Sequence, residues 1–374
     1  MVDFSYLKLR ANLIFRVNIS MKRRDFFKYF SSAAILSTLP KLSKAEKPEF
    51  NWKMVTTWPK NFPGLGTGAQ FLANTIQKLS GGRIKVSVYG AGELVPAFEI
   101  FDAVSNGVAE LGHGSAYYWK GKNDTFQFFS TVPFGMSFNE MNAWLYKGGG
   151  MKLWEKAYAD FNLIPMAAGN TGVQMGGWFN KEISSVNDLK GLKMRIPGLG
   201  GEVLKRAGGT PVNLPGGELF TALKTGTIDA TEWVSPYNDL AFGFHKAAKY
   251  YYYPGWHEPG TTLECFVNAN KFSELPDDLK QIVMGAAKIA NMDMLCEFIS
   301  KNNDALEILQ KKHNVDIRQY PDEVLKELYK ISKDVVKELS LKDDFAKEVY
   351  NSYSSFQQKT NNWNEISIKS YLNI

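Results

Sequence analysis

Strand-like and helix-like segments alternate along most of this chain, and that alternation is the strongest constraint on its fold. Residues 83–89 alternate polar and apolar side chains as a half-buried strand does. Residues 66–79 repeat apolar side chains with the period of a helix. Glycines 81 and 82 separate these two segments. Because the same order of strand, turn and helix recurs up to residue 268, we predict an α/β architecture with largely parallel sheets.

The same reasoning gives an expected order of elements. We expect strands at 51–58, 83–89, 110–114, 162–168, 170–178, 193–197 and 261–268, and a further strand that ends near 229–233. We expect helices at 66–79, 99–108, 139–160, 202–207 and 218–225, with glycines 148–150 interrupting the third. Residues 250–258 read as an aromatic loop. From about residue 276 the chain is mostly helical, with amphipathic helices at 304–312, 322–339 and 344–363.

The first 45 residues resemble an export signal. The paired arginines Arg23 and Arg24 precede a modestly apolar stretch at 29–39, and small residues follow up to Ala45. The pair is similar to the twin-arginine export motif. We therefore expect translation to start at Met21, the signal to be removed after Ala45 and the protein to be periplasmic. A disordered basic tail is the alternative interpretation.

The positive charge of the chain lies in this leading segment. The whole sequence has 44 basic and 38 acidic side chains, for a net charge of +6. Residues 1–45 hold nine of the basic and two of the acidic ones, so the remainder carries 35 and 36. A nearly neutral remainder gives no sign of a nucleic-acid partner. No later stretch reaches the roughly 18 apolar residues of a spanning helix, so the mature chain is expected to be soluble.

The two cysteines, Cys265 and Cys296, match no metal-binding spacing. Two buried free thiols are our first expectation. One disulfide bond between them is the alternative, because an exported protein meets an oxidising compartment.

Enzyme signatures fit poorly. The histidines at 113, 245, 257 and 313 form no H-E-x-x-H motif and accompany no recognisable serine or cysteine nucleophile. Phosphate-binding loops are absent. The glycines at 198, 200 and 201 lack the spacing of a dinucleotide fingerprint, and Pro197 interrupts their turn. We therefore expect a binding protein and no enzyme.

Arg195 is the one charged side chain of the strand at 193–197 that is able to face inward. The preceding segment at 170–178 carries two amides, Asn170 and Gln174. A planar guanidinium opposite amide oxygens is a natural partner for a carboxylate, which it holds through two parallel hydrogen bonds. The alternative is a structural arginine that pairs with an acidic neighbour.

Glu232 complicates this interpretation, because a carboxylate beside an anionic ligand repels it. A bound cation resolves the conflict. Gln174 and Glu232 offer hard oxygen ligands, the main-chain carbonyl of Trp233 offers another, and the ligand adds its own. Glu258 belongs to the same group of polar candidates in the middle third of the chain.

Several long motifs resemble the solute receptors of tripartite ATP-independent periplasmic (TRAP) transporters, and within them the subgroup that binds 2-oxo acids such as pyruvate. The motifs lie at residues 91–96, 169–178, 191–195, 226–233 and 250–256. The match runs in order from residue 50 to roughly residue 300.

The resemblance implies site roles. It makes Arg195 the carboxylate clamp, and it makes Gln174, Glu232 and the Trp233 main chain ligands of a Na⁺ or Ca²⁺ ion that bridges to the substrate. It also implies that Asn170 and Tyr118 contact the substrate and that Trp178 walls the pocket. Glu258 is a further candidate metal ligand. Beside it stands His257, where the family pattern leads us to expect a second tryptophan.

The resemblance also implies two lobes joined by crossing strands and a long helix. We expect lobe I at 46–169 plus 262–300, lobe II at 170–261 plus 301–340, and a C-terminal helix within 341–374 that pairs two copies. The receptor would deliver its ligand to a membrane permease. A calcium–lactate receptor of the same family, a periplasmic enzyme with Glu232 or Glu258 as base, and an adhesive dimer are the alternatives.

Overall fold

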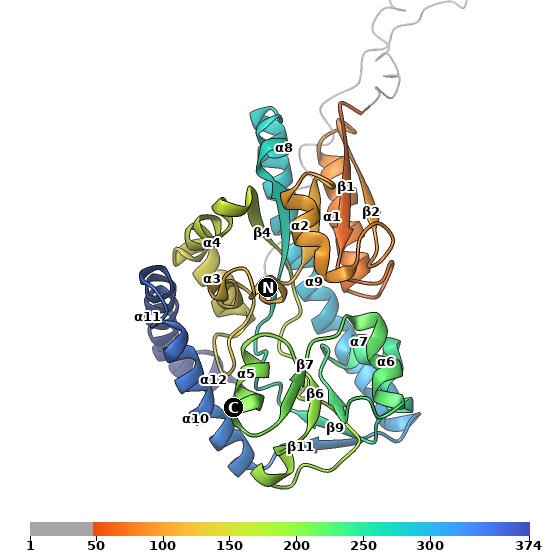
Figure 1. Ribbon diagram of the computed structural model, residues 1–374, viewed down its shortest axis with the longest axis vertical. Helices are drawn as coiled ribbons and strands as arrows, with labels where there is room; N and C mark the ends of the chain where they lie inside the picture. The colour runs from red at the N-terminus through yellow and green to blue at the C-terminus, as the bar shows by residue number, and fades with distance from the viewer. Residues whose placement is uncertain (1–47) are drawn as a thin grey trace, which may run out of the picture. The chain divides into compact units, whose positions relative to one another are not determined.

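The computed structural model of the protein describes residues 48–374. These residues form two mixed β-sheets with flanking helices (Figure 1). The predicted export signal at 1–45 lies outside the described residues. The architecture is α/β with two lobes, as the sequence predicted, and one sheet lies in each lobe. The exact division of the chain between lobes stays a prediction.

The first sheet has five strands in the order β2-β1-β3-β10-β4. They are β1 (Phe50–Thr56), β2 (Ile84–Tyr89), β3 (Leu111–Gly114), β4 (Leu163–Asn170) and β10 (Thr262–Asn268). The second sheet has six strands in the order β11-β9-β5-β8-β6-β7. They are β5 (Gly177–Phe179), β6 (Lys193–Arg195), β7 (Thr210–Val212), β8 (Ala230–Thr231), β9 (Tyr250–Tyr253) and β11 (Asp316–Gln319).

The expectation of largely parallel sheets is right only in part. In the first sheet β10 runs antiparallel to both β3 and β4, and in the second sheet β5 runs antiparallel to both β8 and β9. Both β5 and β10 follow a passage of the chain from one sheet to the other. Each therefore enters its sheet from the end opposite to that at which its neighbouring strands enter.

Helices cover the sheets and connect them. They are α1 (Leu65–Leu79), α2 (Ile100–Ser105), α3 (Phe138–Lys147), α4 (Gly150–Tyr158), α5 (Gly198–Arg206), α6 (Gly216–Lys224), α7 (Pro236–Phe242), α8 (Ala269–Ser273), α9 (Asp277–Lys311), α10 (Asp322–Leu339), α11 (Asp344–Ile366) and α12 (Ile368–Leu372). The helix predicted at 322–339 has the bounds of α10. None of the helices between residues 48 and 374 combines the length and apolar character that crossing a bilayer requires.

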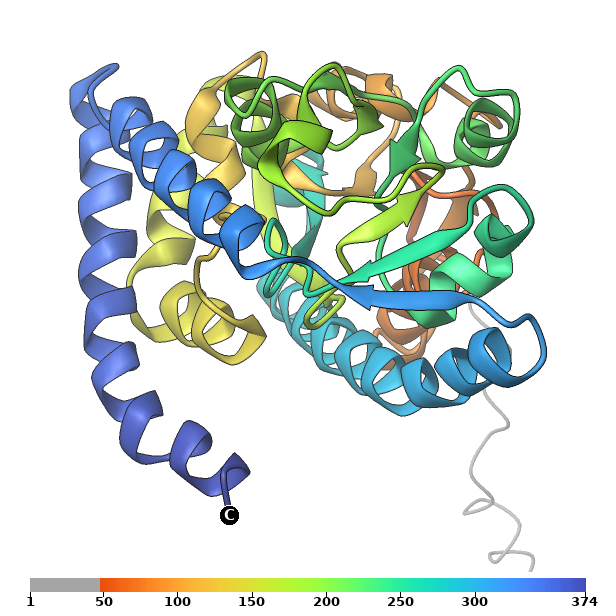
Figure 2. The ribbon, with the colours of Figure 1, turned by 90° about the horizontal axis from the view of Figure 1, so that it is seen from below.

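The long helix α9 ties the lobes together. It is 35 residues long and packs on α1 and β4 of the first lobe and on α7 of the second (Figure 2). Small side chains such as Ala286, Ala287 and Ala290 are buried on its face, which lets the helix lie close to its neighbours. The separate helix predicted at 304–312 is the end of α9, because no proline or glycine interrupts the helix there.

Two other predicted elements differ in the structure. The strand predicted at 170–178 is broken, because β4 ends at Asn170 and β5 begins at Gly177. Gly172 adopts a φ of 70° in the intervening loop, and its N–H donates to the Asn170 side chain at 2.8 Å. The aromatic segment at 250–258 is a loop only after Tyr253, because its first four residues pair with β5 and β11 as strand β9.

Both cysteines are free thiols. Cys265 is buried in β10 and Cys296 is exposed on α9, so the expectation of two buried thiols holds for Cys265 alone.

A buried acid holds β10 against the helices of its lobe. Glu264 is fully buried and accepts hydrogen bonds from Trp119 Nε1 at 2.6 Å and from the Tyr158 hydroxyl at 2.7 Å. Burial raises the pKa of Glu264 from its ordinary value of 4.5 to about 8, and these two hydrogen bonds offset only part of the shift.

We predict that Glu264 makes the protein less stable as the pH rises from about 4.5 to about 8. Over this range the folded state holds a proton on Glu264 that the unfolded chain has lost, so a single group lowers the free energy of unfolding by at most about 1.4 kcal/mol per pH unit. Denaturant unfolding across this range should show a shallower slope for Glu264→Gln.

Part of the slope should remain, because the pKa of Asp239 and that of Glu258 are each raised by burial to about 7. Glu155→Gln, on an exposed face of α4, is the control and should leave the slope unchanged. An unaltered slope in Glu264→Gln would contradict the assignment.

Candidate functional site

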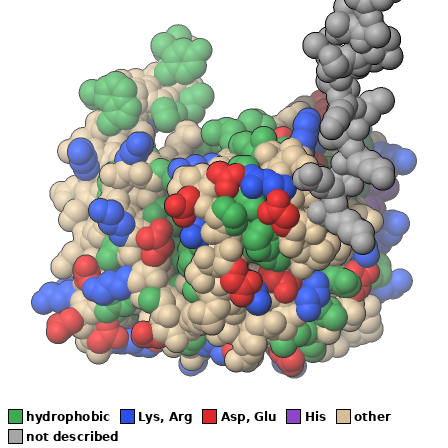
Figure 3. Space-filling view, turned by 90° about the horizontal axis from the view of Figure 1, so that it is seen from above, with side chains coloured by type: hydrophobic (Ala, Val, Ile, Leu, Met, Phe, Trp, Pro, Cys, Tyr) green, Lys and Arg blue, Asp and Glu red, His purple; other side chains and the backbone are tan. Residues whose placement is uncertain are grey.

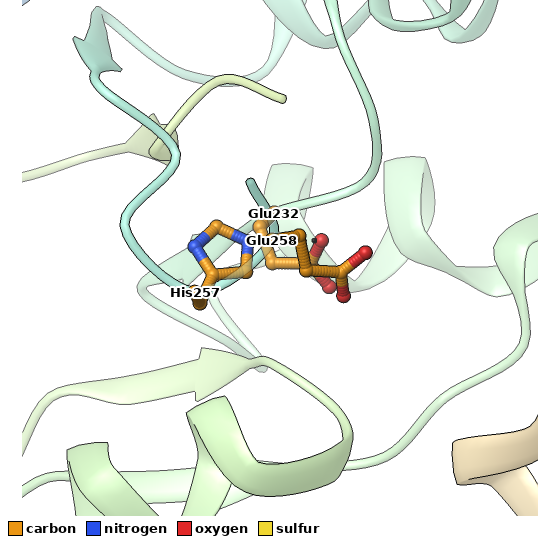
Figure 4. A group of neighbouring side chains, drawn as sticks. All are labelled: Glu232, His257 and Glu258. Atoms are coloured by element: carbon orange, nitrogen blue, oxygen red, sulfur yellow. Dashed lines mark hydrogen bonds and ion pairs between the residues drawn. The ribbon is translucent and has the colours of Figure 1, made fainter. Parts of the chain in front are cut away.

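The candidate site forms where strands of the second sheet end. Strands β6 and β8 run parallel, with Arg195 paired in register with Thr231, so Glu232 follows directly beside Arg195. The loop after β9 adds His257 and Glu258 to the same place (Figure 4). Ends of neighbouring strands that meet at one sheet edge are a common position for ligand sites in α/β folds.

Arg195 lies at the centre of this group and is 1% exposed. Its Nη1 forms an ion pair with the Glu232 carboxylate and also donates to the Glu232 main-chain oxygen at 3.2 Å. Its Nε donates to the Leu214 carbonyl at 3.2 Å and its Nη2 donates to the Tyr118 hydroxyl at 3.2 Å. The Trp233 ring centre lies 5.1 Å from the guanidinium carbon, within cation–π range. Arg195 therefore has an acidic neighbour, Glu232, as the alternative interpretation of a purely structural arginine requires.

The electrostatics keep Arg195 charged. Burial by itself would lower the pKa of Arg195, but the Glu232 carboxylate and neighbouring tyrosines outweigh burial, and the net shift is upward. Burial raises the pKa of Glu258 to about 7, and the negative charge of Glu232 adds to that rise. A second positive charge beside these two carboxylates would relieve their repulsion.

Gln174 has an oxygen that is suited to an ion. Its Nε2 donates to Glu258 Oε2 at 2.8 Å and lies near the hydroxyls of Thr171 and Thr261, which fixes the amide orientation. Its Oε1 is buried and has no hydrogen-bond partner among the described residues. A buried amide oxygen without a donor is costly. The oxygens of Gln174, Glu232 and Glu258 therefore fit a hard cation, which prefers oxygen ligands.

The structure brings most of the predicted site residues together, and their roles stay predictions. Tyr118 contacts Arg195, and Trp233 packs on it. Asn170 is buried at the end of β4, where its side chain shapes the loop that carries Gln174. Trp178 lies in β5 with its Nε1 donating to Asp239 at 3.0 Å and its ring stacked on Tyr251 at 4.1 Å. Trp178 is paired in register with Thr231, which is itself paired with Arg195, and its place in the wall of the pocket stays a prediction.

Sequence reasoning missed Trp58 and His113. The Trp58 ring lies 6.3 Å from Tyr118 and 6.1 Å from Trp233, so it covers the two aromatic neighbours of Arg195. Its Nε1 donates to His113 Nδ1 at 2.9 Å. Burial lowers the pKa of His113 to about 4, so the ring stays neutral and can accept. No local motif marks either residue, since both depend on how β1 and β3 pair.

Comparisons with known proteins give a family match and similar solved structures. Residues 54–343 match the family model described as bacterial extracellular solute-binding protein, family 7. A monocarboxylate 2-oxoacid-binding periplasmic protein from Nostoc sp. is 43% identical over 360 residues, which cover 94% of this chain and 98% of the relative.

Two solved structures are also close. A TRAP periplasmic solute-binding protein from Pseudoalteromonas atlantica, with bound sodium and pyruvate, has a TM-score of 0.84 and 42% identity, covering 87% of this chain and 98% of its own. A TRAP solute-binding protein from Bordetella bronchiseptica has a TM-score of 0.85 and 36% identity, covering 87% and 97%. It is a dimer of mixed occupancy, with calcium and picolinate in one site and an apo second site.

We predict that Arg195 and Glu232 stabilise the fold only as a pair. Arg195→Met should cost about 3–5 kcal/mol, because it leaves the Glu232 charge buried without its partner. Arg195→Met combined with Glu232→Gln should cost clearly less than the sum of the two single changes. Denaturant unfolding in the presence of a chelator measures all three variants.

Arg206→Met is the matched control. Arg206 pairs with Glu202 and Glu338 at the surface, so its loss should cost about 1 kcal/mol or less. Strictly additive effects of Arg195→Met and Glu232→Gln would show that the two side chains do not depend on each other.

Proposed function

The chain belongs to bacterial extracellular solute-binding protein family 7, the solute receptors of TRAP transporters, and we propose that its ligand is a small 2-oxo monocarboxylate such as pyruvate. The observation that carries the proposal is the buried Arg195 with Glu232 and Glu258 in the same group, together with the buried Gln174 oxygen, which has no hydrogen-bond partner between residues 48 and 374. The relative from Nostoc and the neighbour with bound pyruvate support the same ligand class.

A 2-oxo acid carries the two features that this site complements. Its carboxylate suits the planar fork of Arg195. Its keto and carboxylate oxygens can together reach a cation. Gln174, Glu232 and the Trp233 carbonyl would hold that ion, with Glu258 as a further ligand. The ion, Na⁺ or Ca²⁺ by the family pattern, would supply positive charge that lets Glu232 and the ligand carboxylate lie close together.

The residues also suggest how binding would rearrange the site. Arg195 pairs with Glu232 in this structure. When an ion takes the Glu232 carboxylate, Arg195 is free to turn its fork to the ligand. Tyr118 and Trp58 would close over the ligand from the first lobe and exclude water, which strengthens both charged contacts.

We propose further that the protein works in the periplasm, passes the unchanged ligand to the TRAP membrane permease and catalyses no reaction. A receptor must release its ligand intact. The roles that we propose for the site residues, a carboxylate clamp and ligands of an ion, are sufficient for binding and release. Turnover of bound pyruvate would instead favour the enzyme alternative. Preference for lactate would favour the calcium–lactate alternative.

We predict that Arg195→Lys weakens pyruvate binding by about 2–5 kcal/mol, because lysine keeps the charge but loses the planar fork. Isothermal titration calorimetry of the metal-loaded protein measures the change. Chelation should weaken binding to the parent protein as well, since the ion contributes to the same site.

Arg206→Lys, at an exposed ion pair, is the control and should bind as the parent does. Parent-like affinity in Arg195→Lys would refute the clamp. Pyruvate that stays intact through the titration, followed by nuclear magnetic resonance, would support a receptor over an enzyme.

We also propose that two copies pair through the C-terminal arm, defined here as the end of α11 together with α12. In Figure 2 the arm projects from the body, and in Figure 3 hydrophobic side chains gather on a projecting arm at the upper left. Trp363, Ile366, Tyr371 and Leu372 are each at least 64% exposed. Apolar side chains that are so exposed in one segment favour a partner surface. The dimeric Bordetella neighbour supports this proposal.

We predict that Trp363→Glu with Tyr371→Glu converts a dimer into a monomer. Two charges in a buried apolar contact would be left without partners. Light scattering coupled to size-exclusion chromatography measures the mass. Leu341→Glu is the control, because Leu341 is 73% exposed but lies between α10 and α11. A parent protein that is already monomeric, or an unaffected dimer, would contradict the proposal.

A further inference from the structure

We propose that Asp239 is a positioning residue, which holds the peptide unit between Trp233 and Val234 so that the Trp233 carbonyl is directed toward the bound ion. The inference rests on the proposed function, in which that carbonyl is a ligand of the ion. It deepens the function by naming the side chain that sets the direction of the ligand. Asp239 lies in α7 and is not itself one of the proposed ligands.

The peptide unit between Trp233 and Val234 carries both of the groups that matter. Its N–H belongs to Val234 and donates to Asp239 Oδ1 at 3.3 Å. Its carbonyl belongs to Trp233, and the unit is trans. In a planar trans peptide the N–H and the C=O point in opposite directions. A contact that fixes the N–H of Val234 therefore also fixes the direction of the Trp233 carbonyl.

The Trp233 carbonyl is available to an ion. Trp233 is 5% exposed, and no main-chain N–H between residues 48 and 374 donates to its carbonyl. In a residue so little exposed, a main-chain oxygen without a donor is costly, and a cation would satisfy it. The carboxylate of the preceding residue, Glu232, is buried beside it and belongs to the same proposed set of ligands.

Asp239 can fix this peptide unit because Asp239 is itself held on its other side. It is 1% exposed, and its Oδ2 accepts hydrogen bonds from Trp178 Nε1 at 3.0 Å and from the Tyr251 hydroxyl at 2.7 Å. Trp178 lies in β5 and Tyr251 in β9, so the carboxylate connects two strands of the second sheet to the segment 232–235 that follows β8. An ionised carboxylate also polarises the amide that donates to it, which makes the carbonyl of that amide a stronger ligand.

The segment 232–235 is also tied to the loop that carries Gln174. The Val234 carbonyl accepts a hydrogen bond from the N–H of Met175, the residue after Gln174, at 2.9 Å. Loss of the contact with Asp239 would thus leave the segment held from one side alone. We expect the Trp233 carbonyl to turn away from its position relative to Gln174 and Glu232 when this happens.

A purely structural role for Asp239 is the alternative, and Glu264 provides the matched case. Glu264 is fully buried and, like Asp239, accepts hydrogen bonds from one tryptophan and one tyrosine, here Trp119 and Tyr158. It lies in β10 of the first sheet. Of the two acids, Asp239 accepts in addition from a main-chain N–H that shares its peptide unit with a proposed ion ligand.

The test follows the ion on chelator-stripped protein, with Tb³⁺ as a luminescent substitute for Ca²⁺. Luminescence lifetimes in H₂O and D₂O report how many water molecules the ion carries. Asp239→Ser is too short to reach the Val234 N–H, so water should replace the Trp233 carbonyl and the hydration of Tb³⁺ should rise. Calorimetry should show that the ion of the parent, Ca²⁺ or Na⁺, binds about ten- to hundredfold more weakly.

Asp239→Asn is the conservative variant and Glu264→Gln is the matched control. Asp239→Asn keeps one acceptor oxygen, so it should lose less ion affinity than Asp239→Ser, and it decides by the same readouts if Asp239→Ser does not fold. Glu264→Gln should change neither the hydration of Tb³⁺ nor the affinity for the ion. The titrations are run above pH 7, the value near which burial raises the pKa of Asp239, so that its carboxylate is ionised.

The outcomes separate this inference from the proposed function. Parent-like hydration and affinity in a folded but destabilised Asp239 variant would make Asp239 purely structural and overturn the inference, while the proposed function would stand. Ion binding that depends on Asp239, without pyruvate binding in the parent, would support the inference and overturn the proposed ligand. A parent that binds neither Ca²⁺ nor Na⁺ would overturn the ion of the proposed function and the inference with it.

Discussion

The buried ion pair between Arg195 and Glu232 is the interaction on which the rest of the site depends. Both side chains are almost fully buried, so neither charge has water to stabilise it. The parallel register of β6 and β8 fixes the two residues side by side. In the function that we propose, an ion takes the charge of Glu232, so that a ligand carboxylate can bind to Arg195. The loops that carry Gln174 and Glu258 would supply further ligands of that ion.

The two lobes contribute differently to that site. The second sheet supplies the charged groups, while the first lobe supplies an aromatic cover made of Trp58 and Tyr118. His113 accepts a hydrogen bond from Trp58 and stays neutral, so it adds no charge beside the charged groups of the site. The helix α9 packs on elements of both lobes and so connects the part of the chain that carries Trp58 to the part that carries the charged groups.

The sequence predicted what periodicity and side-chain chemistry control. The bounds of α10 follow from a clear amphipathic repeat that begins after Pro321, and Arg195 could be identified as the one inward-facing charge of its strand. The features that the sequence did not predict depend on how distant segments pair in the folded chain. Residues 250–253 form a strand because they pair with both β5 and β11, which the local sequence does not reveal. His257 stood out in the sequence only as a departure from the family pattern, and its distance to Glu232 emerged from the fold.

A crystal structure of the metal-loaded protein with pyruvate would show whether Arg195 binds the ligand or only Glu232. We predict that the pyruvate carboxylate lies on the Arg195 fork, that Glu232 has moved from Arg195 to the ion, and that Gln174 Oε1 faces the same ion. Pyruvate bound elsewhere, with Arg195 and Glu232 still paired, would contradict it and would make the arginine a structural residue.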